Sequence, residues 1–471
     1  MMDRVKGFAG PLLAGLSLFL LLPLTHANPL DYYVQRARTP SLPLAGKKIH
    51  EGRFQQWIDH HQHDLGTFAQ RYYVDEHFAA GKDAPVFFYI CGEGACEKRH
   101  LQGAIWHFAQ QFHARLVALE HRYYGESHPF ATLSAANLRY LSTDAALDDL
   151  ANFQQQLSKE RHWTGRWIAF GGSYPGSLAA YYRLKYPELA AGALASSAPV
   201  MAKSDFIDYD AHVTEVAGSD CAGRMREAVR DIEASFTDPT RLQEIKQLFS
   251  AEAIHENVDF IYVVADLGAM AVQYGMRDYF CEQLASPEKT VLENYAAFAQ
   301  AIFNQYGITA VELSAQGAIS ENPADYNKGF GLRAWLYQSC TEYGYWQNAH
   351  PNPDKSTRSR LINDEYHQRL CQRLFGLTQP ANTERMNTAY YFPLIESGID
   401  NIHFTNGEQD PWSLLSLADR NNNTGNPGLA YSMIAGASHC DDLAAPSADD
   451  SDSLIQTRER TALLLQDWLT S

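Results

Sequence analysis

The sequence has little positive charge for its size. Its 471 residues include 38 Lys and Arg against 55 Asp and Glu, which gives a formal net charge of −17. Nucleic-acid-binding proteins usually carry a basic patch or stripe, so no nucleic-acid partner is expected. After the apolar run at residues 7–24, the sequence lacks a second run of the roughly 20 apolar residues that a membrane span needs. The mature protein is therefore not expected to span a membrane.

The N-terminal apolar run has the pattern of an export signal. Arg4 and Lys6 precede it, and Thr25-His26-Ala27 ends in the small residue that a signal peptidase requires. We expect residues 1–27 to be removed, which predicts a secreted or periplasmic protein, or one in a lysosome-like compartment if the host is a eukaryote. An uncleaved membrane anchor is the alternative.

The seven cysteines lack the paired Cys-x-x-Cys spacing of a zinc site. No metal and no cofactor are expected. An exported protein meets an oxidising compartment, so disulfides are the default interpretation, and the odd count leaves at least one thiol outside them. Four cysteines lie in one stretch of the chain and permit more than one pairing. These are Cys221, Cys281, Cys340 and Cys371.

Short apolar runs alternate with helical stretches in the first part of the chain. The runs at 86–90, 116–119, 167–170 and 191–196 have the length and composition of buried strands. Strands separated by helices are typical of a parallel sheet with helices on both faces.

The pattern changes after about residue 203. Apolar residues then recur at helical spacing to about residue 385, and strand-like runs return at 402–405 and 429–434. We therefore predict a signal peptide at 1–27 and an α/β domain in two parts, 28–203 and 386–471. A helical lid domain at 204–385 is inserted between them.

The segment Phe170–Gly176 combines a strand, a glycine-rich turn and the start of a helix. This is the arrangement of a nucleophile elbow, which lifts a serine hydroxyl above the edge of the sheet at a helix N-terminus. The usual pattern is Gly-x-Ser-x-Gly; here Pro175 stands at the last position and glycine follows one residue later. We interpret Ser173 as a nucleophile and the fold as an α/β-hydrolase.

Two further residues follow strands in the order that this fold requires, serine, then acid, then histidine. Asp410 lies in a turn after the strand at 402–405, and His439 follows the strand at 429–434. His439 would take the proton of Ser173, which attacks a carbonyl to form an acyl-enzyme, while Asp410 holds the imidazole.

The oxyanion of such an intermediate needs two backbone N–H donors. One is expected from Tyr174, the residue after the nucleophile. The other is expected from the loop after the strand at 86–90, at Gly92.

The sequence resembles the prolyl-type serine peptidase family that includes lysosomal Pro-Xaa carboxypeptidase, dipeptidyl-peptidase II and thymus-specific serine protease. The resemblance covers nearly the whole mature chain and is closest to the thymus-specific branch. The matching segments are GEG (92–94), EHRYYGES (120–127), GGSYPGSLAAYYRLKYPEL (171–189), ASSAPV (195–200), WLYQSCTEYGY (335–345), NGEQDPW (406–412) and GASHCDDL (436–443).

The resemblance implies an α/β-hydrolase domain with an inserted helical lid and cleavage next to proline or another small residue. It implies that Ser173, Asp410 and His439 match the family triad. It also favours the pairs Cys221–Cys281 and Cys340–Cys371, which close the shorter loops. Cys91 and Cys96 can form a local bridge, and Cys440 is then expected to stay outside the disulfides.

Three residues are candidates for binding a peptide substrate. Glu93, at the position where the dipeptidyl-peptidase branch captures the free amine, predicts an enzyme that releases short N-terminal fragments; alternatively, it hydrogen-bonds its own loop. Trp335 could form a wall for a proline ring, although aromatic residues at helical spacing usually belong to the core. Trp412, in the segment NGEQDPW, is a further candidate for substrate binding.

Several alternatives stay open at this point. An esterase or lipase uses the same triad, and a proline-specific carboxypeptidase or endopeptidase fits the same resemblance. A hydrolase fold used only for binding is disfavoured because all three triad residues are present. A homodimer is possible. Glu120 and Arg122 are interpreted as a structural polar network beneath the site.

Overall fold

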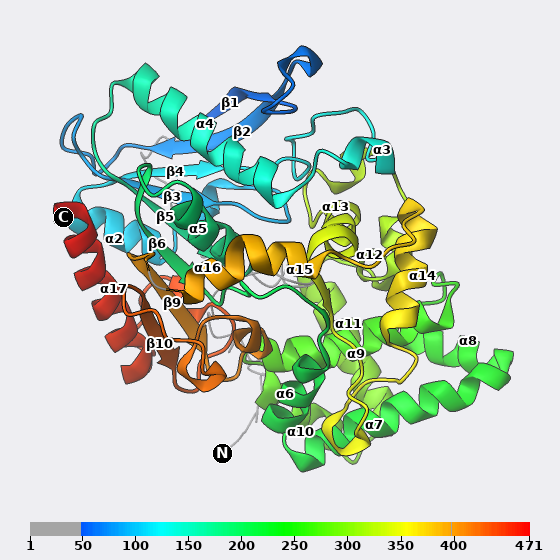
Figure 1. Cartoon of the computed structure of the whole chain (residues 1–471). Coiled ribbons are helices and arrows are strands. Elements are labelled where there is room, and N and C mark those ends of the chain that lie inside the picture. Colours follow the sequence, from blue (N-terminus) through cyan, green and yellow to red (C-terminus); the bar gives the residue numbers. More distant parts are fainter. Residues whose placement is uncertain (1–48, 397) are drawn as a thin grey trace, which may run out of the picture.

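A single twisted sheet forms the centre of the protein in the computed structural model, which describes residues 49–396 and 398–471 (Figure 1). The predicted signal peptide lies outside these residues. The described strands follow the order β1-β2-β4-β3-β5-β6-β9-β10, and β2 pairs antiparallel with β1 and β4, whereas the other pairs are parallel. The strand bounds are β1 His50–Trp57, β2 Thr67–Asp75, β3 Val86–Ile90, β4 Arg115–Leu119, β5 Trp167–Gly172, β6 Ala190–Ser196, β9 Ile402–Gly407 and β10 Ala430–Ile434.

Side chains of the sheet alternate between two hydrophobic clusters. On β3, Val86, Phe88 and Ile90 belong to one cluster, whereas Phe87 and Tyr89 belong to the other. This alternation is what a strand buried on both faces requires. Helices cover both faces, with α4 and α5 on one and α2 and α17 on the other. Their bounds are α2 Ala104–Phe112, α4 Thr143–Arg161, α5 Tyr174–Lys185 and α17 Asp452–Thr470.

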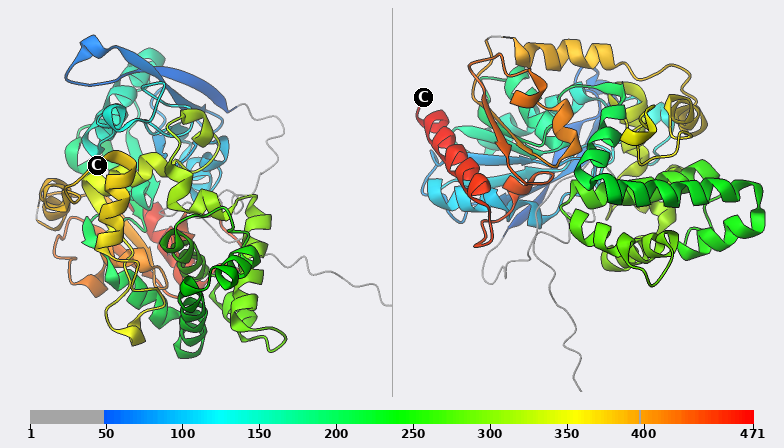
Figure 2. Two further views of the ribbon diagram at one scale, coloured as in Figure 1. Left: turned by 90° about the vertical axis from the view of Figure 1, so that its right-hand side faces the viewer. Right: turned by 90° about the horizontal axis from the view of Figure 1, so that it is seen from below.

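A group of helices lies beside the sheet, between β6 and β9 in the sequence (Figure 2). A short parallel pair, β7 Lys203–Asp205 with β8 Gly344–Trp346, joins its beginning to its later part. The helices are α6 Ile207–Ala217, α7 Ser219–Ala234, α8 Pro239–Leu248, α9 Asn257–Gln273, α10 Arg277–Ala285, α11 Val291–Tyr306, α12 Ala310–Leu313, α13 Leu332–Gln338, α14 Asp364–Phe375, α15 Thr383–Met386 and α16 Phe392–Ile395. A further short helix, α3 Ala135–Leu138, precedes α4.

The strand order, the parallel core and the helical segment between β6 and β9 are those of an α/β-hydrolase fold with a helical insertion, as the sequence predicts. Disulfides join α7 to α10 through Cys221 and Cys281, and the turn after α13 to α14 through Cys340 and Cys371. No helix of the described residues is both long enough and apolar enough to cross a membrane.

Candidate active site

Ser173 occupies a strained turn between β5 and α5. Its φ of 58° and ψ of −130° lie in a region that residues other than glycine seldom adopt. A Cβ on Gly171 would lie 2.0 Å from the carbonyl oxygen of Pro175, and one on Gly176 would lie 2.8 Å from that of Ser196. The turn can therefore form only with glycine at both positions. Gly176, one residue later than in the usual pattern, thus still provides the space that the elbow requires.

His439 and Asp410 form a hydrogen-bonded pair at the ends of β10 and β9. The imidazole Nδ1 lies 2.7 Å from Asp410 Oδ2. The other carboxylate oxygen, Oδ1, accepts a hydrogen bond of 2.9 Å from the backbone N–H of Trp412. With Nδ1 donating to the carboxylate, Nε2 is left as the proton acceptor of the ring.

The elbow of Ser173 and the loop that carries His439 both pack against the end of β6. The backbone N–H of Ser173 donates to the carbonyl of Ser196 at 2.8 Å, and the thiol of Cys440 lies 3.3 Å from the same oxygen. Ser173, His439 and Asp410 are all 0% exposed. Within the described residues, neither Ser173 Oγ nor His439 Nε2 has a hydrogen-bond partner. The two atoms between which a triad passes a proton are thus both buried, and in this structure they are hydrogen-bonded neither to each other nor to another group of the described residues.

The end of α9 packs over the histidine. The carbonyl of Gln273 accepts a 3.0 Å hydrogen bond from the backbone N–H of His439, and the ring of Tyr274 meets the imidazole edge-on at 5.9 Å. The side-chain oxygen of Gln273 accepts from Tyr209 and from the indole of Trp412. The helical insertion therefore contacts the loops that carry His439 and Trp412 directly.

Gly92 lies against the nucleophile elbow. A Cβ at this position would come within 2.3 Å of the Pro175 ring and 3.7 Å of the Tyr174 ring. The loop after β3 is tied to the helical insertion as well, because the N–H of Gly331 donates to the carbonyl of Glu93 at 2.8 Å. The two positions predicted to supply oxyanion donors are thus neighbours.

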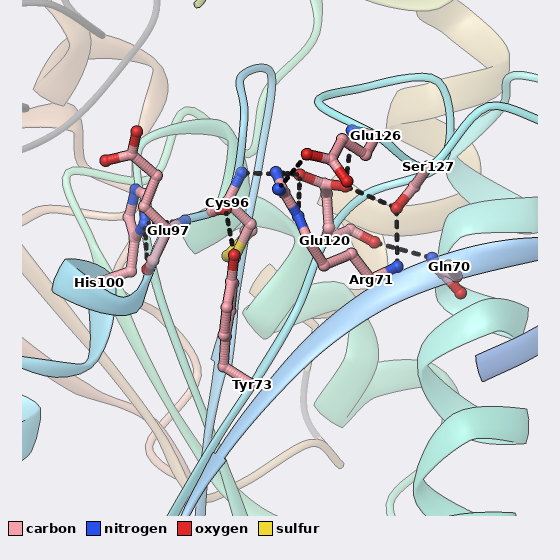
Figure 3. Close-up of a disulfide and its surroundings, with 10 residues drawn as sticks. Gln70, Arg71, Tyr73, Cys96, Glu97, His100, Glu120, Glu126 and Ser127 are labelled. Carbon is pink, nitrogen blue, oxygen red and sulfur yellow. Dashed lines mark hydrogen bonds and ion pairs between the residues drawn. A yellow bond between two sulfur atoms is a disulfide. The ribbon is translucent and has the colours of Figure 1, made fainter. Parts of the chain in front are cut away.

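A buried polar network fixes the far end of this loop (Figure 3). The carboxylate of Glu120 accepts from Arg71 Nε at 3.2 Å, from Ser127 Oγ at 2.6 Å and from the backbone N–H of Cys96 at 2.9 Å. Burial raises the pKa of Glu120, and Arg71 opposes that shift. Cys96 also forms a disulfide with Cys91, so the loop that contains Gly92 is closed at both ends.

Tyr174 is held by a second network that sequence reasoning missed. Its hydroxyl lies 2.9 Å from His121 Nε2 and accepts from Gln338 Nε2 at 2.8 Å. Burial lowers the pKa of His121 to about 4, so the ring is neutral at neutral pH. Its Nδ1–H donates to the carbonyl of Arg122 at 2.7 Å, which leaves Nε2 to accept from Tyr174. This chain of contacts orients the residue next to the nucleophile.

Aromatic side chains form a continuous wall from the elbow into the helical insertion. The ring of Tyr174 lies 5.3 Å from Trp335, and Tyr345 lies 6.4 Å from Trp335 and 5.5 Å from Trp412. Trp335, Tyr345 and Trp412 line one cavity of about 60 Å³. The structure thus brings the two predicted tryptophans together. Glu93 does not line this cavity; it is buried, and its charge raises the pKa of Tyr124 and Tyr174 beyond the effect of their burial.

Glu342 joins the helical insertion to α4 by a buried carboxylate. It accepts from the backbone N–H of Thr143 at 3.1 Å and from its hydroxyl at 2.9 Å, at the first residue of α4. Burial raises the pKa of Glu342 to about 7, although both contacts from Thr143 oppose the shift. The folded protein therefore binds a proton here at pH values where the unfolded chain does not.

This shift predicts that Glu342 itself contributes more stability in mild acid than at higher pH. Because the folded pKa of Glu342 is raised, its contribution is complete below the unfolded value of 4.5 and is lost as the pH rises through about 7. From pH 5 to 8 the unfolding free energy of the wild type should decrease relative to that of Glu342→Gln, by at most on the order of 3 kcal/mol. Urea unfolding of both proteins across this range measures the difference, and equal slopes would contradict the assignment.

Comparison with known proteins gives a consistent group of relatives. The model of a family described as serine carboxypeptidase S28 matches residues 56–461. The chain is 35% identical over 402 residues to the probable serine protease EDA2 of Arabidopsis thaliana, which covers 83% of this chain and 79% of the relative. It is 31% identical to the thymus-specific serine protease of Mus musculus, with 86% and 84% covered. The lysosomal Pro-X carboxypeptidase of Bos taurus is 28% identical, with 88% and 87% covered.

Solved structures match at much lower identity. A proline iminopeptidase of Mycobacterium smegmatis has a TM-score of 0.40 and 11% identity, covering 89% of this chain and 99% of that one. A haloalkane dehalogenase variant from Bradyrhizobium elkanii has a TM-score of 0.39 and 12% identity, with 90% and 97% covered.

Proposed function

Since the chain belongs to the serine carboxypeptidase S28 family and is therefore a serine-type peptidase, we propose that Ser173, Asp410 and His439 form its catalytic triad. The observation that carries this proposal is the 2.7 Å bond between His439 and Asp410, on a loop that packs against the end of β6 as the strained elbow of Ser173 does. His439 Nε2 takes the proton of Ser173, and the serine oxygen attacks the scissile carbonyl. The resulting imidazolium is stabilised by the Asp410 carboxylate.

The backbone N–H groups of Tyr174 and Gly92 are the proposed oxyanion donors. They belong to neighbouring segments, and each segment is held by buried hydrogen bonds, through His121 and Gln338 for Tyr174 and through Glu120 for the loop of Gly92. Donors that are already oriented stabilise developing charge without a cost of reorganisation at the moment of reaction.

Trp335 and Trp412 are proposed to receive a proline or another small residue at the cleaved bond. A proline ring has no N–H to satisfy and packs favourably on aromatic faces. The cavity between these tryptophans is small, about 60 Å³, which favours a compact residue over a long one. We propose that the helical segment 204–385 serves as the lid that shapes this cavity and covers the triad.

The proposed enzyme is an exopeptidase that acts in an oxidising compartment, outside the cell or in a lysosome-like organelle. Three disulfides in the described residues support this location. A lysosomal enzyme is among the relatives.

Two hypotheses about the terminus that is recognised lead to different results. If Glu93 pairs with the free amine of the substrate, Glu93→Gln should lower kcat/KM at least about tenfold for free-amine peptides and have little effect on N-acetylated ones. A carboxypeptidase, which the family description and the bovine relative favour, would cut acetylated peptides as well as free ones and would require a free C-terminal carboxylate.

One peptide set decides between them. The same peptides, ending in Pro-Xaa or beginning with Xaa-Pro, are prepared with free ends, with an acetylated N-terminus and with an amidated C-terminus. Products are read by mass. Equal cleavage of acetylated and free peptides by the wild type contradicts amine recognition, and equal cleavage of amidated and free peptides contradicts the carboxypeptidase alternative.

A further inference from the structure

His367, on α14, is a buried histidine whose ring nitrogens are not satisfied. Its exposure is 1%, and within the described residues neither Nδ1 nor Nε2 has a hydrogen-bond partner. Most buried side-chain polar atoms in proteins have a partner, because leaving one unsatisfied is costly. A histidine of the ordinary core would donate through one nitrogen and accept through the other.

Aromatic rings hold this imidazole in place without bonding to it. It stacks on Trp346 at 4.4 Å with an angle of 9° between the planes, and it meets Tyr262 and Tyr366 edge-on at 5.7 and 4.9 Å. Burial, together with Arg358, lowers the pKa of His367 to about 3, so the ring is neutral and offers one donor and one acceptor. Its orientation is thus fixed by packing alone.

His367 lines the same cavity as Trp335 and Trp412. Those two tryptophans belong to the aromatic wall that reaches Tyr174, next to the proposed nucleophile. The cavity lies within the helical insertion and against Trp412, and the contact between Trp335 and Tyr174 connects its wall to the elbow. The imidazole is among its lining residues. A substrate residue seated against the tryptophans would extend toward His367.

We propose that His367 is a specificity-determining residue, which hydrogen-bonds a neutral hydroxyl or carboxamide side chain of the peptide residue seated in this cavity. The inference rests on the proposed peptidase function, and among the small residues proposed for this cavity it favours those with a polar side chain over proline. Serine, threonine and asparagine carry such groups on side chains short enough for a cavity of about 60 Å³.

The charges around the cavity favour a neutral group over a charged one. Arg358 Nη2 lies 2.8 Å from Asp266 Oδ1, so the nearest cation and the carboxylate that lines the cavity compensate each other. A hydroxyl or a carboxamide can donate to one imidazole nitrogen or accept from the other, whichever the ring tautomer presents. An apolar side chain of the same size would leave the imidazole unsatisfied.

The test compares isosteric substrates on three variants. Peptides carry either Thr or Val at each position around the cleaved bond, and kcat/KM is measured for every pair. We expect the wild type to prefer Thr about tenfold at one position, as one additional buried hydrogen bond allows. His367→Phe, which keeps the ring stack, should abolish the preference, and His367→Gln, which keeps a donor and an acceptor, should retain part of it.

Leu370→Met is the matched control. Leu370 lines the same cavity without a polar group, so this variant should keep the preference for Thr. Absence of any Thr preference in the wild type, or an unchanged preference in His367→Phe, would overturn the inference while leaving the peptidase assignment intact. Absence of peptide cleavage by the wild type would overturn the peptidase assignment, and this inference with it.

Discussion

Ser173→Ala is expected to lower kcat/KM for peptides by more than about a thousandfold while the protein stays folded. The substitution removes only the hydroxyl oxygen. The strained φ of 58° is imposed by the elbow and its glycine contacts, and alanine places its Cβ where serine does. Hydrolysis that depends on an acyl-enzyme then has no nucleophile, whereas the Asp410–His439 pair and the cavity remain in place. Steady-state rates and circular dichroism measure the two parts of this prediction.

Ser177→Ala provides the matched control for this variant. Ser177 is equally buried on the first turn of α5, but its hydroxyl only approaches the carbonyl of Ser173 at 3.5 Å. This change should leave kcat/KM within a few-fold of the wild type. If Ser173→Ala retained peptide cleavage close to that of Ser177→Ala, another group would have to be the nucleophile.

Asp410→Asn is expected to lower kcat by about 10⁴-fold, comparable to the loss known for the acid of other serine triads. The carboxylate accepts from the N–H at Nδ1 of His439, which keeps Nε2 as the acceptor for the serine proton. An amide group can present its NH₂ to Nδ1, which favours the tautomer with the proton on Nε2. The imidazole then cannot act as a base, and the imidazolium loses its counter-charge.

Asp442→Asn is the matched control. It removes a carboxylate from the loop that carries His439, but this carboxylate does not bond to the imidazole. Asp442 is buried and accepts from Ser196 Oγ at 2.5 Å and from Thr405 Oγ1 at 2.7 Å. We expect this control to lose some stability and at most about tenfold in kcat, because the weakened contacts, two hydroxyls and the charge of Arg458, do not involve the imidazole. Equal losses of kcat in both variants would argue against a specific role for Asp410.

The parallel core of the sheet follows from the sequence because its strands are buried on both faces. The run predicted at 86–90 coincides with β3, and those predicted from 167 and 402 begin where β5 and β9 begin. The antiparallel strands β1 and β2 were not predicted from the sequence. β1 lies at the edge of the sheet, and its large apolar residues are only Phe54 and Trp57, so its sequence lacks a continuous apolar signal.

The triad candidates follow from the sequence because each comes directly after a strand, and the carboxyl ends of parallel strands meet at one edge. The residues that hold Tyr174, next to the nucleophile, could not be predicted in this way. Gln338 donates a hydrogen bond to Tyr174 from a helix of the insertion, 164 residues later in the sequence. No local sequence pattern predicts such a contact. The role of His367 could not be predicted either, because the sequence of an amphipathic helix does not show whether a histidine's ring nitrogens will have hydrogen-bond partners. Tertiary packing decides both.

The most direct test of the central assignment is active-site labelling with a fluorophosphonate, followed by peptide mapping. The probe reacts with a serine only where a base activates it and an oxyanion site stabilises the adduct. We predict one adduct, on the peptide that contains Ser173, absent in Ser173→Ala and strongly reduced in Asp410→Asn. An adduct on a different serine, or labelling of Ser173→Ala equal to that of the wild type, would contradict it.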